Sequence, residues 1–164
     1  MSTDALHIPV DDLVGHTGRD RAFDGTRHVD LRLGESHIDG PMAVEGKVVG
    51  TLDGVNARFE ASARINYVCN RCLVSWEDDL TAHGTQHFRI DPDEDGYAIE
   101  DGHVDVGSPA KDELALAIPA TPLCQENCLG LCPTCGTDLN REPCGGHDVE
   151  SDSPFAALKD LFDS

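Results

Sequence analysis

This chain of 164 residues is poor in aromatic and basic side chains and has no long apolar run. Aromatic residues make up 5% of it, and Lys and Arg number 12 against 31 Asp and Glu. No apolar stretch is long enough to predict a membrane-spanning helix, and the first residues, MSTDALHIPVDDLV, lack the basic and apolar segments of a signal peptide. We therefore expect a cytoplasmic protein of one domain. Its apolar core is modest, so additional cross-links such as bound metal ions would add to its stability.

The net charge of −19 at pH 7 favours basic partners over nucleic acids. Nucleic-acid binders neutralise phosphates with Lys and Arg, and a surface this acidic repels RNA and DNA. It attracts a basic protein instead, because complementary fields steer encounter. The alternative interpretation is that the acidic residues only provide solubility or reflect a salt-rich host.

Residues 27–90 show the alternation of β-strands, and Asp53-Gly54 predicts a hairpin turn. Flanking strands are indicated by RHVDLRL at 27–33 and by the run from Met42 to Gly50. The clearest strand is 55–67, and a further one leaves the turn at 69–72. The apolar positions of these two strands are Val55, Ala57, Phe59, Ala61, Ala63, Ile65 and Tyr67, and then Trp76, Leu80, Ala82, Phe88 and Ile90.

The fold class predicted from these strands is mainly β, as a β-rich α+β protein. We expect a curled antiparallel sheet or small barrel with one or two short helices and a C-terminal zinc-knuckle region. Residues 1–26 indicate a short helical turn or strand followed by a loop. Ser108 is expected to cap a helix that carries Pro109 in its first turn and ends near Ile118.

Three parts of the chain are expected. Residues 1–118 form a β-rich body with the short helix, and 119–148 form a cysteine-rich zinc-binding segment packed on that body. Residues 149–164 form a linker and an amphipathic tail, PFAALKDLF.

Seven cysteines and one histidine stand in four close pairs: Cys69/Cys72, Cys124/Cys128, Cys132/Cys135 and Cys144/His147. In a reducing cytoplasm such pairs indicate metal ligands rather than disulfides, which an odd number of cysteines also fits poorly. Four ligands of this kind make one tetrahedral zinc site, so the pairs predict one or two structural Zn²⁺ ions. Buried free thiols are the bland alternative, and a redox dithiol at Cys69/Cys72 would need a βαβ context.

Two pairings of the ligands are possible. In the first, Cys69, Cys72, Cys124 and Cys128 bind one ion, and Cys132, Cys135, Cys144 and His147 bind the other. In the second, Cys69/Cys72 shares an ion with Cys132/Cys135, which leaves the other two pairs together. We favour the first because residues 132–147 can close on one ion through a short loop, which costs little entropy. Gly136 also suits a knuckle turn.

Nothing in the sequence nominates a catalytic residue, so we expect a protein that is not an enzyme. Eight ligands for two ions leave no open position for water. No H-E-x-x-H, G-x-S-x-G, His-x-Glu or glycine-rich phosphate loop occurs. The acidic loop at 91–96 lacks the final Glu of a calcium loop, and His83 and His87 are interpreted as solvated on a polar strand face.

Four segments together resemble the YceD family, named for accumulation of the large ribosomal RNA: CNRCL at 69–73, DELALAIPATPLCQENC at 112–128, GLCPTCGTDLN at 130–140 and SPFAALKDL at 153–161. The resemblance covers roughly residues 60–162. It implies a role in the accumulation or processing of 23S rRNA and so in assembly of the large ribosomal subunit. It also favours the first pairing, because some family members keep only the first ligand group.

The leading hypothesis is a non-enzymatic assembly factor that binds a basic ribosomal protein or another assembly factor. One alternative is direct rRNA binding through Arg58, Arg64 and Arg71. The other is an rRNA-processing hydrolase built on Asp91, Asp93 and Asp95, the one carboxylate cluster that could serve.

Overall fold

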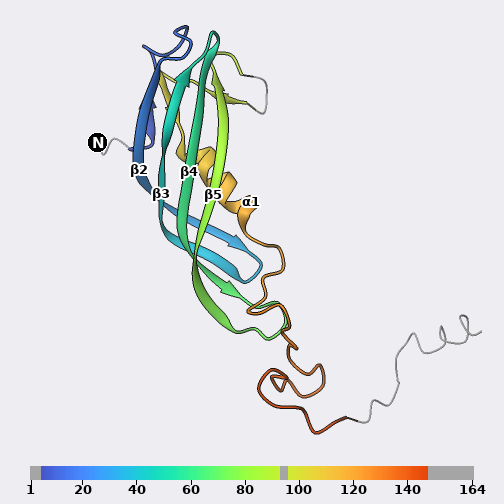
Figure 1. Cartoon of the computed structure of the whole chain (residues 1–164). Helices are drawn as coiled ribbons and strands as arrows, with labels where there is room; N and C mark the ends of the chain where they lie inside the picture. The colour runs from blue at the N-terminus through green and yellow to red at the C-terminus, as the bar shows by residue number, and fades with distance from the viewer. Residues whose placement is uncertain (1–4, 93–95, 148–164) are drawn as a thin grey trace, which may run out of the picture.

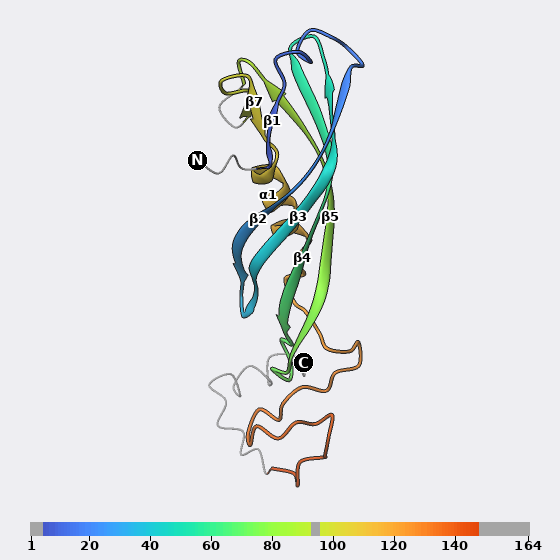
Figure 2. The same cartoon turned by 90° about the vertical axis from the view of Figure 1, so that its left-hand side faces the viewer.

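A computed structural model describes residues 5–92 and 96–147, which form a long curled antiparallel sheet with a helix against one face (Figure 1). A cysteine-rich coil continues beyond one end of the sheet. Figure 2 shows the same sheet from the side, with the helix and the short N-terminal strand on one face. The predicted fold class is confirmed: the chain is mostly β, with a curled sheet and a short helix.

The main sheet has the order β2-β3-β4-β5-β6. Its four long strands are consecutive and antiparallel: β2 (Asp20–Leu33), β3 (Ser36–Gly50), β4 (Gly54–Val68) and β5 (Ser75–Arg89). The short β6 (Tyr97–Ala98) pairs parallel with β5. A separate pair, β1 (His7–Pro9) and β7 (His103–Asp105), leads into the helix α1 (Gly107–Ala117).

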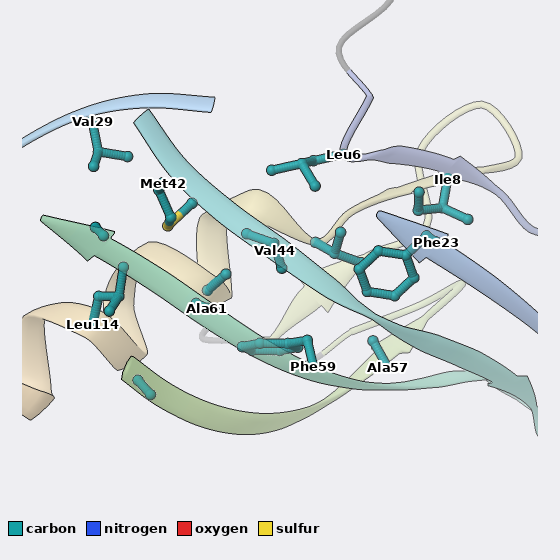
Figure 3. Packing of buried hydrophobic residues seen from close by; sticks show 14 of the residues in the cluster. Leu6, Ile8, Phe23, Val29, Met42, Val44, Ala57, Phe59, Ala61 and Leu114 are labelled. Atoms are coloured by element: carbon teal, nitrogen blue, oxygen red, sulfur yellow. The ribbon is translucent and has the colours of Figure 1, made fainter. Parts of the chain in front are cut away.

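The apolar alternation of β4 places its whole predicted set in the core. The side chains from Val55 to Tyr67 at every second position are no more than 8% exposed. They pack with Met42 and Val44 of β3 and with Leu114 of α1 (Figure 3). The period of two therefore identified the buried face of the central strand correctly.

Two strand expectations are corrected at their ends. Ile90 is 65% exposed, because β5 ends at Arg89 and the chain leaves the sheet there. β2 already begins at Asp20, where a loop was expected, and its first residues pair with 43–49 of β3. The sequence signal is weak in that part of β2 because Phe23 alone supplies an apolar side chain to the buried face.

The expected capping of α1 by Ser108 is wrong. The helix already includes Ser108, and Val106 occupies the N-cap without a side-chain cap bond. Asp105 serves instead: its carboxylate accepts hydrogen bonds from the Gly107 N–H at 3.0 Å and the Ser108 hydroxyl at 2.6 Å. It also pairs with Arg27 at 2.6 Å. Burial works against the charge of Asp105, but these donors outweigh it and hold the pKa of the carboxyl below its ordinary value.

One glycine permits the close approach of β3 to β4. A Cβ atom on Gly46 would lie 2.1 Å from the carbonyl oxygen of Arg58, a backbone atom that cannot swing away. A Cβ atom on Gly40, in the same strand, would have no neighbour within 4 Å. The approach of β3 to β4 at this point thus depends on the absence of a side chain at position 46.

We expect Gly46→Ala to lower the free energy of unfolding by about 2 kcal/mol or more, because β3 and β4 must separate to admit the methyl group. The matched control Gly40→Ala should change it by no more than about 0.5 kcal/mol or stabilise slightly, since alanine loses less entropy on folding. Urea unfolding of both variants measures the difference. Equal effects of the two substitutions would show that the strand approach at Gly46 is not a constraint.

Candidate metal centre

The first group of cysteines joins the tip of the β4–β5 hairpin to the segment after α1. Cys69 and Cys72 lie in the turn between the two strands, and Cys124 and Cys128 follow the helix. The four sulfur atoms all lie within 4.8 Å of one another. This grouping is the first of the two pairings considered above.

The turn at Cys69 is held by two backbone hydrogen bonds. The Cys69 N–H donates to the Val74 carbonyl at 2.9 Å, and the Leu73 N–H donates back to the Cys69 carbonyl at 2.9 Å. Leu73 has a φ of 61°, in the left-handed region that only glycine adopts without strain. A leucine kept there, with 59% of its surface exposed, indicates that the surroundings impose the turn.

The turn at Cys132 repeats this geometry. The Cys132 N–H donates to the Thr137 carbonyl at 2.8 Å, and the Gly136 N–H donates to the Cys132 carbonyl at 2.9 Å. Gly136, like Leu73 the residue after the second cysteine, has a φ of 73°. Two C-x2-C segments with no other sequence in common therefore form the same turn, which presents both sulfurs on one side.

The sulfur separations in the first group suit a tetrahedral ion. Cys69 and Cys128 are 3.7 Å apart, and Cys72 and Cys124 are 3.5 Å apart. A disulfide needs about 2.05 Å, whereas Zn–S bonds of about 2.3 Å place the corners of a tetrahedron roughly 3.8 Å apart. The residues present fit a zinc ion in both donor type and spacing.

The electrostatics of the group also favour a cation. Burial alone would raise the pKa of Cys69, but backbone N–H groups of Cys124, Cys72 and Arg71 lower it to about 6, which favours the thiolate near neutral pH. The protein atoms around Cys124, together with the neighbouring sulfurs, raise its pKa to about 12. Four adjacent thiolates repel one another, and a divalent cation at their centre would relieve that repulsion.

Three side chains support the sulfurs from outside. Arg71 donates to the carbonyl of Cys128 at 2.8 Å. Asn140 donates to the Cys128 sulfur at 3.4 Å and accepts from the Leu129 N–H at 2.8 Å. Asp138 in turn accepts from the Asn140 side-chain amide at 2.7 Å. Asn140 and Asp138 come from the stretch after the second knuckle, so they connect the two cysteine groups. Neither was predicted from the sequence, because Asn and Asp in a loop carry no distinguishing pattern.

The second group brings together three of its four predicted ligands. Cys132, Cys135 and His147 place their ligand atoms within 4.8 Å of one another, and Cys144 is not among them. The Thr137 hydroxyl and N–H lower the pKa of Cys135 to about 6, helped by His147 and Cys132. Hydrogen bonding to Cys135 raises the pKa of His147, which here is a close neighbour of the thiols.

The other residues singled out from the sequence do not converge. Arg64 pairs with Asp79 at 3.1 Å and Glu77 at 3.6 Å, and Arg71 is engaged with Cys128. His83 and His87 lie beside different carboxylates, those of Glu60 and Asp53. Asp91 is exposed, and Asp93 and Asp95 fall outside the described residues, as does the predicted tail at 149–164.

Fold and site together define a curled β-protein with cysteine groups that can hold a metal ion. A family model described as "Large ribosomal RNA subunit accumulation protein YceD" matches residues 57–162, and the chain belongs to this family. This bears out the resemblance stated above.

The chain is also similar to uncharacterized proteins of mycobacteria. One from Mycobacterium tuberculosis is 31% identical over 143 residues, which cover 86% of this chain and 65% of that protein. One from Mycobacterium leprae is 31% identical over 130 residues, or 74% of this chain and 59% of that protein. The chain therefore spans somewhat less than two thirds of the length of these relatives. No solved structure matches it. Among the described residues, no helix has the length and apolarity to cross a bilayer.

Removing metal should loosen the cysteine-rich segment and leave the sheet intact, because the buried cysteines are not members of the apolar core cluster. We expect a strong chelator to keep the far-ultraviolet circular dichroism of the sheet and to open residues 119–147 to proteolysis. Adding zinc back should restore protection. Cys72→Ser should be cleaved there without chelator, whereas a surface change such as Ser75→Ala should behave as the unaltered chain. If neither the chelator nor Cys72→Ser changes the rate of cleavage within residues 119–147, the segment is not held by a structural metal.

Proposed function

We propose that this protein is a non-enzymatic cytoplasmic factor for accumulation or processing of 23S rRNA and assembly of the large ribosomal subunit. It acts by binding a basic protein, either a ribosomal protein or another assembly factor. The observation that carries the proposal is family membership over residues 57–162, since the family is described by accumulation of this RNA.

The metal part of the proposal is two structural zinc ions. The first is bound by Cys69, Cys72, Cys124 and Cys128, which supply four sulfurs and leave no position for a reacting water. The second is bound by Cys132, Cys135 and His147, with Cys144 as the fourth ligand. The twin knuckle turns support this assignment, because each presents two sulfurs in the arrangement that one tetrahedral ion requires.

We choose a basic protein as the partner because few of the chain's cationic side chains are free to bind phosphate. Most of its arginines are already paired with carboxylates: Arg19 and Arg21 with Asp12, Arg27 with Asp105, Arg32 with Asp30, Arg64 with Asp79, Arg89 with Asp53, and Arg141 with Asp138. Phosphate binding would have to break these pairs. The acidic residues far outnumber the cations, and their excess suits a positively charged partner.

Direct rRNA binding receives less support. Of its three predicted arginines, Arg64 is paired with Asp79, and Arg71 donates to the Cys128 carbonyl. Arg58 makes neither a side-chain hydrogen bond nor an ion pair within the described part of the chain. Arg58 lies opposite Lys47 on the outer face of the sheet, in a groove that also contains Asp24, Glu45 and Glu60. Those carboxylates would repel a phosphate backbone.

Deleting the gene should lower 23S rRNA relative to 16S and reduce large subunits in sucrose gradients, and the unaltered chain should restore both. A variant with Cys69→Ser and Cys72→Ser should fail to restore them, while Ser75→Ala should succeed. Unchanged 23S rRNA in the deletion strain would refute the proposed role. A submicromolar, salt-insensitive complex of the purified protein with naked 23S fragments would refute the choice of a protein partner.

A further inference from the structure

A groove of about 440 Å³ lies beside the first cysteine group, between the sheet and the segment that follows α1. The sheet contributes Tyr67, Trp76 and Asp78, and the segment contributes Pro122, Leu123 and Glu126. Tyr67 belongs to the apolar core and Trp76 packs against it, whereas Asp78 and Glu126 are exposed at the groove.

Two stacked aromatic rings form the wall on the sheet side. Tyr67 of β4 and Trp76 of β5 are register partners, with ring centroids 5.2 Å apart and planes inclined by 30°. Tyr67 is buried, whereas Trp76 is only half-buried and borders the groove. A half-exposed indole face attracts cations, and among protein cations the planar guanidinium stacks on it best.

An acidic residue interrupts the apolar face of β5 at this groove. Asp78 occupies the same face as the buried Leu80 and Ala82, where the alternation calls for an apolar side chain. Its carboxylate accepts a hydrogen bond from the N–H of Asp79 at 2.9 Å and makes no ion pair within residues 5–92 and 96–147. Burial and, after it, the nearby Asp78 carboxylate raise the pKa of Tyr67.

The opposite wall adds a second uncommitted carboxylate. Glu126 lines the groove and has neither a hydrogen bond nor an ion pair in the described part of the chain. Asp79, one residue from Asp78 on the other face of the strand, is by contrast paired with Arg64. Within residues 5–92 and 96–147, no ion pair therefore occupies either of the two carboxylates that line the groove.

The cysteine centre determines the distance between the two walls. The Asn70 N–H, inside the first knuckle, donates to the Pro122 carbonyl at 3.0 Å. Leu123 directly precedes Cys124, whose sulfur lies 3.5 Å from that of Cys72. Groove and metal centre therefore share the same junction between hairpin and segment.

We propose that this groove binds an arginine-bearing segment of a basic protein, with the guanidinium stacked on Trp76 and paired with Asp78 and Glu126. The inference rests on the proposed function, because it describes how that partner is held. The aromatic wall supplies the flat surface and the two carboxylates supply the complementary charge. A nucleic-acid base could also stack on Trp76, but its phosphates would meet the same two carboxylates.

Trp76 is the sole tryptophan of the chain, so its fluorescence reports on this groove alone. The probe is the peptide acetyl-Gly-Arg-Gly-Arg-Gly-amide, compared with its neutral citrulline analogue, each titrated at low salt. We expect a saturable change in Trp76 emission with the arginine peptide and none with citrulline. Asp78→Asn should raise the Kd about fivefold or more. Glu45→Gln, which removes an exposed carboxylate from the outer face of β3, should change it less than about twofold.

Equal effects of Asp78→Asn and Glu45→Gln, or equal binding of the citrulline peptide, would overturn the inference, as would a Trp76 response to single-stranded RNA but not to the peptide. Circular dichroism and zinc content establish that Asp78→Asn is folded. The rRNA assay separates this inference from the proposed function. If the unaltered chain restores 23S rRNA while the peptide fails to bind, the groove assignment alone is wrong. If the chain has no effect on 23S rRNA, the proposed function fails.

Discussion

Four sulfur atoms from two distant parts of the chain lie together at the end of the β4–β5 hairpin. The arrangement of the cysteine-rich segment beyond the sheet depends on this contact. Cys69 and Cys128 are 59 positions apart in sequence, and Cys72 and Cys124 are 52 apart. Between them lie β5, the β7 region and α1. Joining the ends of so long a loop costs closure entropy, which a metal ion bound by all four sulfurs would offset. The same junction positions Pro122 and Leu123 against β5 and so forms the aromatic groove.

The apolar core explains why such a junction is needed. The side chains of the sheet and α1 form one cluster, and it ends at Tyr67 and Leu80, short of the cysteine-rich segment. Beyond that point the described chain is coil, and its few large apolar side chains, such as Leu129 at 66% exposed, bury too little surface to order the segment by themselves. Left-handed Leu73 is consistent with this view: its strain persists because the knuckle requires that turn, and a bound ion would stabilise it.

The sequence predicted the features that depend on residues close together in the chain, and it missed most of those that depend on distant residues. The long strand at 55–67 and the two C-x2-C turns were predictable because period two and ligand spacing are local properties. The grouping of Cys69 with Cys128 rather than Cys132 was favoured by loop length and by the resemblance, but the sequence left the other pairing open, since the grouping depends on where the chain returns after α1. The start of β2 at Asp20, the capping of α1 by Asp105 and the support of Cys128 by Asn140 were missed. The start of β2 and the support of Cys128 depend on contacts with other parts of the chain, which no periodic signal marks. The cap is local, but Asp105 lies one residue before the N-cap, where the sequence pattern pointed to Ser108. The groove at Trp76 was missed as well. The alternation of β5 already placed position 78 on the apolar face, but it could not show that Pro122, Leu123 and Glu126 lie opposite it.

The measurement that tests this account most directly is native mass spectrometry of the protein purified without added zinc, with elemental analysis of the same sample. The account predicts two zinc ions per chain, and one after Cys69→Ser and Cys72→Ser are combined. A folded chain that carries no metal, and gains none when zinc is supplied, would contradict it.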